Sequence, residues 1–204
     1  MESSANLRSS DRVSMKGRLV LLHGWGADGN DLRPLGNALN ARMASTLEVV
    51  SLEAPTLQAQ GSGRQWYGLF PADWDAVPAA VSQLQQRLLG LQGGEAALKN
   101  TVLFGFSQGG AMAIHAGCQL PLAGVISCSG YPHPIWNPPS EHPPVLLLHG
   151  TEDAVVPFEA MEQLQGKLDS ELCSTHSFRN GHTIPEETMQ PIQNFIRSVL
   201  TKPL

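Results

Sequence analysis

The stretch TVLFGFSQGGAMAIHAG, residues 101–117, places a serine between glycines at the point where one kind of periodicity gives way to another. Residues 101–106 form an apolar, β-branched run typical of a buried strand, and a helix-like run follows Ser107. The pattern is G-x-S-x-G, in which the flanking glycines leave room for strand and helix to approach each other. It predicts a sharp turn that lifts the hydroxyl above the carboxyl edge of a sheet, where the backbone N–H of Gln108 points at the same space.

Strand-like runs alternate with helix-like segments along the rest of the chain. The helix-like segments 75–91, 157–171 and 185–201 carry apolar residues at a spacing of three and four. This alternation predicts an α/β fold with a mostly parallel central sheet and helices on both faces. We expect a single domain over residues 17–204, preceded by a polar N-terminal tail at 1–16. Strands are predicted at 18–24, 47–55, 101–106, 122–130, 144–150 and 172–178.

A serine is a weak nucleophile unless a base removes its proton and an acid orients that base. In α/β hydrolases these residues follow one another as serine, acid, histidine. Among the histidines after Ser107, only His182 lies in a loop past a strand from which it can reach over the sheet edge; the alternative is that it caps the last helix. Asp153 lies just beyond the strand 144–150, and its neighbour Glu152 is a rival expected to face the other way. The predicted triad is therefore serine, Asp153 and His182.

The first glycine-rich loop, LLHGWGADGND at 21–31, has two interpretations. It follows the first strand, where α/β hydrolases supply the second N–H of an oxyanion hole. It also contains G-x-G-x-x-G, and Glu53 follows at roughly the distance expected of a dinucleotide site. Asn30 or Asp31 is the expected N-cap, so that Pro34 falls in the first turn of the helix. A dinucleotide helix would begin earlier and hold that proline in its interior, at a cost of about 3 kcal/mol. We therefore favour the oxyanion interpretation.

A third loop, SGRQWYGLF at 62–70, carries aromatic side chains after the second strand, on the same sheet edge as Ser107. An apolar loop there could line an acyl pocket, or it could simply cover the core. The sequence leaves these two alternatives equally open. The residues predicted to contact substrate are Trp66, Tyr67, Phe70 and Val156.

Composition excludes several classes of partner. The chain has 13 basic and 18 acidic residues, a formal net charge of −5 and no basic cluster, so we expect no nucleic-acid partner. Its apolar runs are strand-sized, far short of the roughly 20 residues of a membrane span, so no stable membrane insertion is expected. The three cysteines lack the C-x-x-C spacing, which favours small buried side chains in a reducing cytoplasm. No ligand cluster for a metal is apparent.

Taken together, the motifs resemble the carboxylesterase/phospholipase family of serine hydrolases, which includes the acyl-protein thioesterases. The resemblance runs from LLHGWGADGND through APTLQAQGSGRQWYGLF, GFSQGGAMA and HGTEDAVVP to GHTIP, and the first block is similar to the bacterial-type branch. It implies a compact α/β-hydrolase fold without a large cap domain. It also implies Ser107, Asp153 and His182 as the triad, and the backbone N–H groups of Trp25 and Gln108 as the oxyanion hole. By the same resemblance, the tryptophan of the third loop lies beside an acyl channel.

The resemblance implies a serine esterase that cleaves carboxylic esters of short to medium acyl chains through an acyl-enzyme. It implies no cofactor and no metal, and a substrate that is a small-molecule or lipid-like acyl ester. A homodimer is a candidate assembly. The alternatives are an acyl-protein thioesterase or a lysophospholipase and, from another class, a non-catalytic binding protein on a hydrolase scaffold. The last would be marked by a missing triad residue, and none is missing.

Activity should rise with pH between about 6 and 7, because the imidazole of His182 must be neutral to accept the serine proton. The measurement is kcat/KM for a p-nitrophenyl ester across this range at constant ionic strength. A flat profile would count against His182 as the base.

Overall fold

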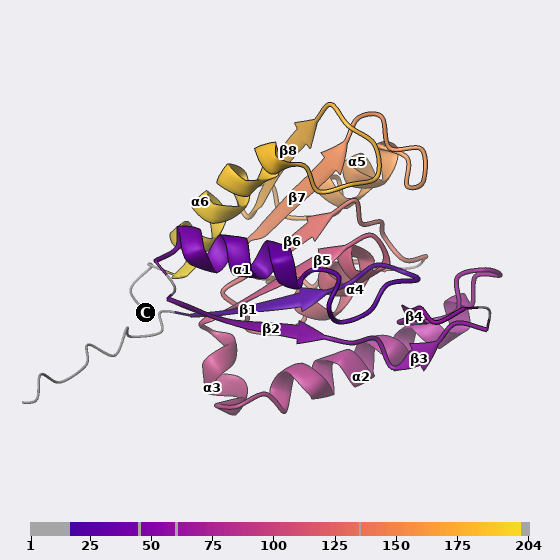
Figure 1. The fold of residues 1–204 in the computed structure, drawn as a ribbon, viewed down its shortest axis with the longest axis horizontal. Helices are drawn as coiled ribbons and strands as arrows, with labels where there is room; N and C mark the ends of the chain where they lie inside the picture. Colours follow the sequence, from indigo (N-terminus) through magenta and orange to yellow (C-terminus); the bar gives the residue numbers. More distant parts are fainter. Residues whose placement is uncertain (1–16, 45, 60, 135, 201–204) are drawn as a thin grey trace, which may run out of the picture.

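The computed structural model describes residues 17–44, 46–59, 61–134 and 136–200. The tail predicted for residues 1–16 lies outside the described residues. Within the described part, the chain folds as a central sheet with helices packed on both of its faces (Figure 1).

The central sheet has six strands in the order β2-β1-β5-β6-β7-β8, and every neighbouring pair is parallel. Each strand falls within, or within one residue of, a run that the sequence predicts, and the parallel α/β arrangement is confirmed. The strands β1, β2 and β6 end two or three residues before the runs predicted at 18–24, 47–55 and 122–130. Their bounds are β1 (Gly17–Leu22), β2 (Leu47–Leu52), β5 (Thr101–Phe106), β6 (Gly124–Cys128), β7 (Val145–Gly150) and β8 (Cys173–Phe178).

The helices divide between the two faces of this sheet (Figure 1). Buried side chains of α1 and α6 pack on one face, and those of α2, α4 and α5 pack on the other. A short antiparallel pair, β3 and β4, lies in the segment between β2 and α2. The bounds are α1 (Arg33–Arg42), α2 (Val77–Leu89), α3 (Gly94–Leu98), α4 (Gln108–Gly117), α5 (Glu159–Gln165), α6 (Met189–Leu200), β3 (Thr56–Leu57) and β4 (Arg64–Gln65), with short 3-10 turns η1 (Trp74–Ala76) and η2 (Glu186–Thr188).

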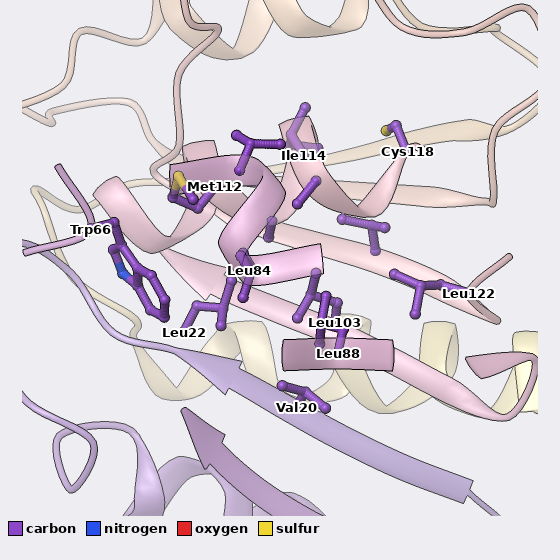
Figure 2. Packing of buried hydrophobic residues seen from close by; sticks show 14 of the residues in the cluster. Val20, Leu22, Trp66, Leu84, Leu88, Leu103, Met112, Ile114, Cys118 and Leu122 are labelled. Carbon is purple, nitrogen blue, oxygen red and sulfur yellow. The ribbon is translucent and has the colours of Figure 1, made fainter. Parts of the chain in front are cut away.

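Alternate residues of the strands supply the two cores. In β1, Val20 and Leu22 join the core under α2 and α4, whereas Leu19 and Leu21 join the core under α1 and α6. The first of these cores is shown in Figure 2, where Leu103 of β5 is drawn in the same cluster as Val20 of β1 and Leu88 of α2. Because side chains on a strand alternate between faces, a strand covered on both sides must be apolar at nearly every position. This explains the continuous apolar runs in the sequence.

The helix α1 begins where the position of Pro34 predicts, but its N-cap is not one of the two residues that were expected. α1 starts at Arg33 with Pro34 in its first turn. Its N-cap position is Leu32, which makes no side-chain cap bond, so the assignment of Asn30 or Asp31 as cap is wrong. The turn before the helix is closed by a hydrogen bond of its own, in which the N–H of Asn30 donates to Asp28 Oδ1 at 2.7 Å. The helix nevertheless begins after the third glycine of the loop, as the oxyanion interpretation requires.

Candidate active site

The turn between β5 and α4 holds Ser107 in a strained backbone conformation. Its φ is 55° and its ψ is −119°, a region that residues other than glycine rarely adopt. Backbone atoms pass too close for any side chain at the two flanking glycines. A Cβ added to Gly105 would lie 2.0 Å from the carbonyl oxygen of Gly109, and one added to Gly109 would lie 2.2 Å from that of Leu22. The motif therefore does what its spacing predicts, which is to bring strand and helix into direct backbone contact.

The parallel sheet brings the predicted site residues to one edge. Because all six strands run in the same direction, the loops that follow them lie at their common carboxyl edge. Trp25 follows β1, Ser107 follows β5, Asp153 follows β7 and His182 follows β8. Trp25 and His182, which are 157 residues apart in the chain, therefore lie in loops at the same edge of the sheet.

His182 and Asp153 form a direct hydrogen bond. Nδ1 of His182 donates to Oδ2 of Asp153 at 2.7 Å, and the aspartate side chain is fully buried. Because an ionised carboxylate only accepts hydrogen bonds, Nδ1 carries the hydrogen and Nε2 is left as an acceptor. The ring of Phe106, the residue before Ser107, lies 4.8 Å from the imidazole, centroid to centroid. The histidine thus lies over the end of β5, beside the serine turn.

The carboxylate of Asp153 is held by its own loop as well as by the histidine. Its Oδ1 accepts the N–H groups of Val155 and Val156, both at 2.9 Å. Burial acts to raise the pKa of this carboxyl, but the hydrogen bonds from His182 and from the two valine N–H groups outweigh burial and leave the pKa below its ordinary value. Ionised Asp153 therefore stabilises the fold above about pH 4, and this contribution is lost as the pH falls.

Glu152, the rival acid, points away from the histidine as expected. Its side chain is exposed and pairs with Arg179, with Nε of the arginine 2.9 Å from Oε1 of the glutamate. A pair this exposed contributes little to stability. The side chain of Glu152 therefore belongs to the surface.

His149, which was not among the residues predicted from the sequence, lies beside the acid and supports its loop. Nε2 of this buried histidine donates to the carbonyl oxygen of Val156 at 2.9 Å and lies 3.6 Å from Oδ2 of Asp153. It therefore fastens the loop whose N–H groups hold the carboxylate. The signal that could have found it is a repeat of LLHG at 21–24 and 147–150, at the ends of β1 and β7.

His23 is the counterpart of that histidine at the end of β1. Its Nε2 accepts the N–H of Ala54 at 3.0 Å, and its Nδ1 donates to the carbonyl oxygen of Gly24 at 2.8 Å. Burial lowers the pKa of His23, which is consistent with a neutral ring that donates at one nitrogen and accepts at the other. Both LLHG histidines thus fasten loops at the sheet edge.

The two N–H groups predicted for an oxyanion hole are free of protein acceptors. Among the described residues, neither the backbone N–H of Trp25 nor that of Gln108 donates a hydrogen bond to the protein. The loop of Trp25 packs directly on the serine, since a Cβ added to Gly24 would lie 3.4 Å from Cβ of Ser107. Gln108 is the first residue of α4, where N–H groups have no partner within the helix.

The side chain of Gln108 has a role of its own. It is fully buried, its Oε1 accepts the N–H of Trp66 at 3.0 Å, and its Nε2 donates to the carbonyl oxygen of Tyr67 at 2.9 Å. The indole N–H of Trp66 in turn donates to the carbonyl oxygen of His23 at 2.9 Å. These bonds fasten the third loop to both the serine turn and the first loop.

Of the four predicted substrate contacts, only Phe70 exposes most of its side chain. It is 75% exposed and meets the ring of Trp25 edge to face, with the centroids 4.9 Å apart. Trp66 and Tyr67 are each 3% exposed and belong to the core, so they follow the core-covering alternative left open by the sequence. Val156 is also buried and enters the site through its backbone N–H.

Three further observations on the described part of the chain concern metal binding, membrane-spanning helices and the reactivity of the cysteines. It contains no group of three or more His, Cys, Asp or Glu residues placed to hold a metal ion. None of the helices described is both long and apolar enough to cross a membrane. Burial raises the pKa of the Cys118 and Cys128 thiols to about 12, so both are inert as nucleophiles.

Comparison with known proteins accords with this geometry. Residues 9–200 match the family model described as phospholipase/carboxylesterase. The chain belongs to this family. The solved structure of esterase PE8 is 30% identical, has a TM-score of 0.78 and covers 91% of this chain and 94% of that one. SOBER1 of Arabidopsis thaliana, 24% identical with a TM-score of 0.73 over 91% of this chain and 99% of that one, shares the fold.

A curated relative of the family covers a shorter stretch. Acyl-protein thioesterase 1 of Gibberella zeae is 32% identical over 122 residues, which are 48% of this chain and 48% of that protein. The matched part thus spans about half the length of this relative. The α/β-hydrolase fold and the family expected from the sequence are both confirmed, and no large cap domain is present among the described residues. The dinucleotide interpretation of the first loop is not supported.

Replacement of Gln108 by alanine should destabilise the protein by about 2–4 kcal/mol, because it leaves a buried N–H of Trp66 and a buried C=O of Tyr67 without partners. Urea unfolding followed by circular dichroism measures the change. The matched control is Gln190→Ala, at an exposed glutamine that bonds only Asn194 on the same helix, for which we expect a change within about 0.5 kcal/mol. Equal stability of the two variants would contradict the role given to Gln108.

Proposed function

We propose that this chain is a serine esterase in which Ser107 is the nucleophile, His182 the general base and Asp153 the residue that orients the base. The observation that carries the proposal is the 2.7 Å hydrogen bond between His182 Nδ1 and the buried Asp153, at the same sheet edge as the strained serine turn. A histidine whose Nδ1 is bonded to a carboxylate presents an unprotonated Nε2, which is what a serine nucleophile requires.

The reaction follows from these positions in two stages. Nε2 of His182 takes the hydroxyl proton as Oγ of Ser107 attacks the acyl carbonyl, and a tetrahedral intermediate forms. The imidazolium then gives its proton to the leaving alcohol, and the acyl group remains on the serine. Water, deprotonated by the same histidine, attacks the acyl-enzyme, and the proton returns to Oγ as the carboxylic acid leaves.

Each remaining part of the site stabilises charge that develops during these steps. Because the pKa of Asp153 lies below its ordinary value, the carboxylate is ionised at neutral pH and stabilises the imidazolium. The free N–H groups of Trp25 and Gln108 are the donors for the oxyanion. Loss of one such donor costs about 3 kcal/mol in other enzymes.

The surface beside the site favours an ester with an apolar acyl group of short to medium length. Trp25, Phe70 and Val155 leave large apolar side chains exposed at the loops that carry the site. The proposed substrate is accordingly a small-molecule or lipid-like acyl ester. The cytoplasmic location, the homodimer and the single domain over residues 17–204 stay predictions.

A second candidate is an acyl-protein thioesterase. The similarity to acyl-protein thioesterase 1 of Gibberella zeae favours it, although it spans about half of each chain. The chemistry of acyl transfer to Ser107 is the same for an oxygen ester and a thioester, so the triad does not distinguish them. A lysophospholipase differs from both only in the alcohol that leaves.

Ser107→Ala should lower hydrolysis of p-nitrophenyl butyrate by at least about 10³-fold without loss of the fold. The measurement is kcat/KM, together with labelling by a fluorophosphonate probe, which the variant should not undergo. Ser82→Ala, at an exposed serine of α2, is the matched control and should behave as wild type. Wild-type turnover in Ser107→Ala would contradict the proposal and favour a binding protein on a hydrolase scaffold.

A panel of p-nitrophenyl esters from acetyl to palmitoyl, with an acyl thioester added, separates the candidate substrates. We expect kcat/KM to be highest for short to medium chains, because the exposed apolar surface beside the site is formed by few side chains. A higher kcat/KM for palmitoyl esters or for the thioester would favour the thioesterase instead. Ser107→Ala supplies the background rate for every substrate.

A further inference from the structure

Strand β8 forms one end of the central sheet, at the opposite side from β2 (Figure 1). Among the described strands it pairs with β7 alone, so its other edge faces outward. The side chains of Ser174, Thr175 and Ser177 are exposed along the strand. An open strand edge is a template for pairing with another chain, and proteins usually protect such an edge.

Alternate residues of β8 point their backbone groups away from the sheet. The carbonyl oxygens of Leu172 and Phe178 accept N–H groups of β7 and of the residue after it, so the even-numbered residues face β7. In a parallel ladder the residues between them point the other way. The outward N–H and C=O groups, which bond no other described residue, are those of Cys173, Thr175 and Ser177.

The strand lacks the features that usually protect an edge. Residues 172–178, LCSTHSF, contain no proline, lysine, arginine, aspartate or glutamate. Their register with β7 is one to one, without a bulge. At the other end of the sheet, β2 carries Glu48, which pairs with Arg18. The edge of β8 is therefore regular, uncharged and able to accept a further strand.

The outward groups are arranged symmetrically about Thr175. If two copies of β8 lie antiparallel with Thr175 at the centre, it faces its own counterpart, and Cys173 faces Ser177 of the other copy. Residues that face one another in this way exchange both of their backbone hydrogen bonds. A register centred one residue to either side would leave Cys173 or Ser177 without a strand residue opposite. The strand edge is thus complementary to itself in one register.

Opposite charges flank the strand at equal distances from its centre. Glu171 lies four positions before Thr175, and Arg179 lies four positions after it. Both side chains are exposed, so the same antiparallel register brings Glu171 of each copy to Arg179 of the other. Arg179 also pairs with Glu152 of its own chain at 2.9 Å. Because a guanidinium has several N–H donors, it can hold both carboxylates.

We propose that the outer edge of β8 is a dimer interface, where a second copy of this chain pairs antiparallel about a two-fold axis at Thr175. The two sheets then form one continuous sheet, with matching helices on the same face. The proposal gives the predicted homodimer a surface and a register, and it does not depend on the esterase activity. A strand edge buries less area than a standard interface of about 1,600 Å², so the dimer is weak, with Kd on the order of 10–500 µM.

Sedimentation equilibrium of the full chain, from about 1 to 500 µM, tests the interface. We expect wild type to dimerise reversibly within this range. Thr175→Pro should weaken Kd by at least about tenfold, because it removes the backbone N–H at the axis from both copies. That N–H bonds nothing within one copy and an edge strand tolerates proline, so the fold should survive. Thr175→Val keeps the N–H and the branched side chain, and as the matched control it should keep the wild-type Kd.

An exchange of charges tests the register without touching the strand. Arg179→Glu places a carboxylate beside Glu171 of the second copy and should weaken Kd about three- to tenfold. Addition of Glu171→Lys restores opposite charges across the axis and should return Kd to within about twofold of wild type. Both residues are exposed, so these changes leave the core intact.

A cysteine at position 175 tests the axis directly. In the proposed register its Cα lies about 5.5 Å from that of its counterpart, within the range that a disulfide spans. Ser174→Cys, at the neighbouring exposed residue, is the matched control, because its two copies would lie roughly 8 Å apart, beyond that range. With a mild oxidant, Thr175→Cys should give a covalent dimer on a non-reducing gel. Ser174→Cys and wild type, which both carry Cys173, should stay monomeric on the gel.

Three results would overturn the proposal. The first is a monomer at every concentration up to about 500 µM. The second is a dimer whose Kd changes in neither Thr175→Pro nor Arg179→Glu, which would place the contact on another face. The third is cross-linking of Ser174→Cys as complete as that of Thr175→Cys, which would contradict the register.

Discussion

The close passage of backbone over backbone at the serine turn is the constraint on which the rest of the site depends. α4 can begin directly after β5 only because Gly105 and Gly109 carry no side chain; a Cβ at Gly109 would lie 2.2 Å from the carbonyl oxygen of Leu22 in β1. The contact fixes the start of α4 against the central strands of the sheet. It also forces a positive φ on Ser107, a conformation that costs on the order of 1–3 kcal/mol and that surrounding contacts must hold.

Buried polar side chains hold the loops around this turn in place. Gln108 fastens the third loop to the start of α4, and the two LLHG histidines, His23 and His149, fasten the loops after β1 and β7. Each of these groups is buried, and Gln108 and His23 are bonded at both ends, so the proposed catalytic residues sit on a framework with little freedom to move. Such support is what precise placement of a nucleophile and its base requires.

A second group of hydrogen-bonded side chains, Tyr67, Tyr131, His133 and His115, extends from the third loop to α4. Tyr67 connects the two groups, because its carbonyl oxygen accepts from Gln108 while its hydroxyl bonds His133 and Tyr131. Trp66 and Tyr67 of the third loop thus serve as a link within the protein rather than as an open pocket wall.

The sequence by itself determined the parallel α/β sheet, the serine turn and the family. Continuous apolar runs reflect burial on both faces, and the glycine spacing is a local requirement of backbone contact, so both can be read along the chain. Asp153 and His182 could be predicted because the order of loops at a parallel sheet edge follows from topology. The cap of α1, the burial of Trp66 and Tyr67, and the roles of Gln108 and His149 were decided only by the tertiary structure. They depend on which segments distant in sequence lie within hydrogen-bond distance, and no local pattern records that.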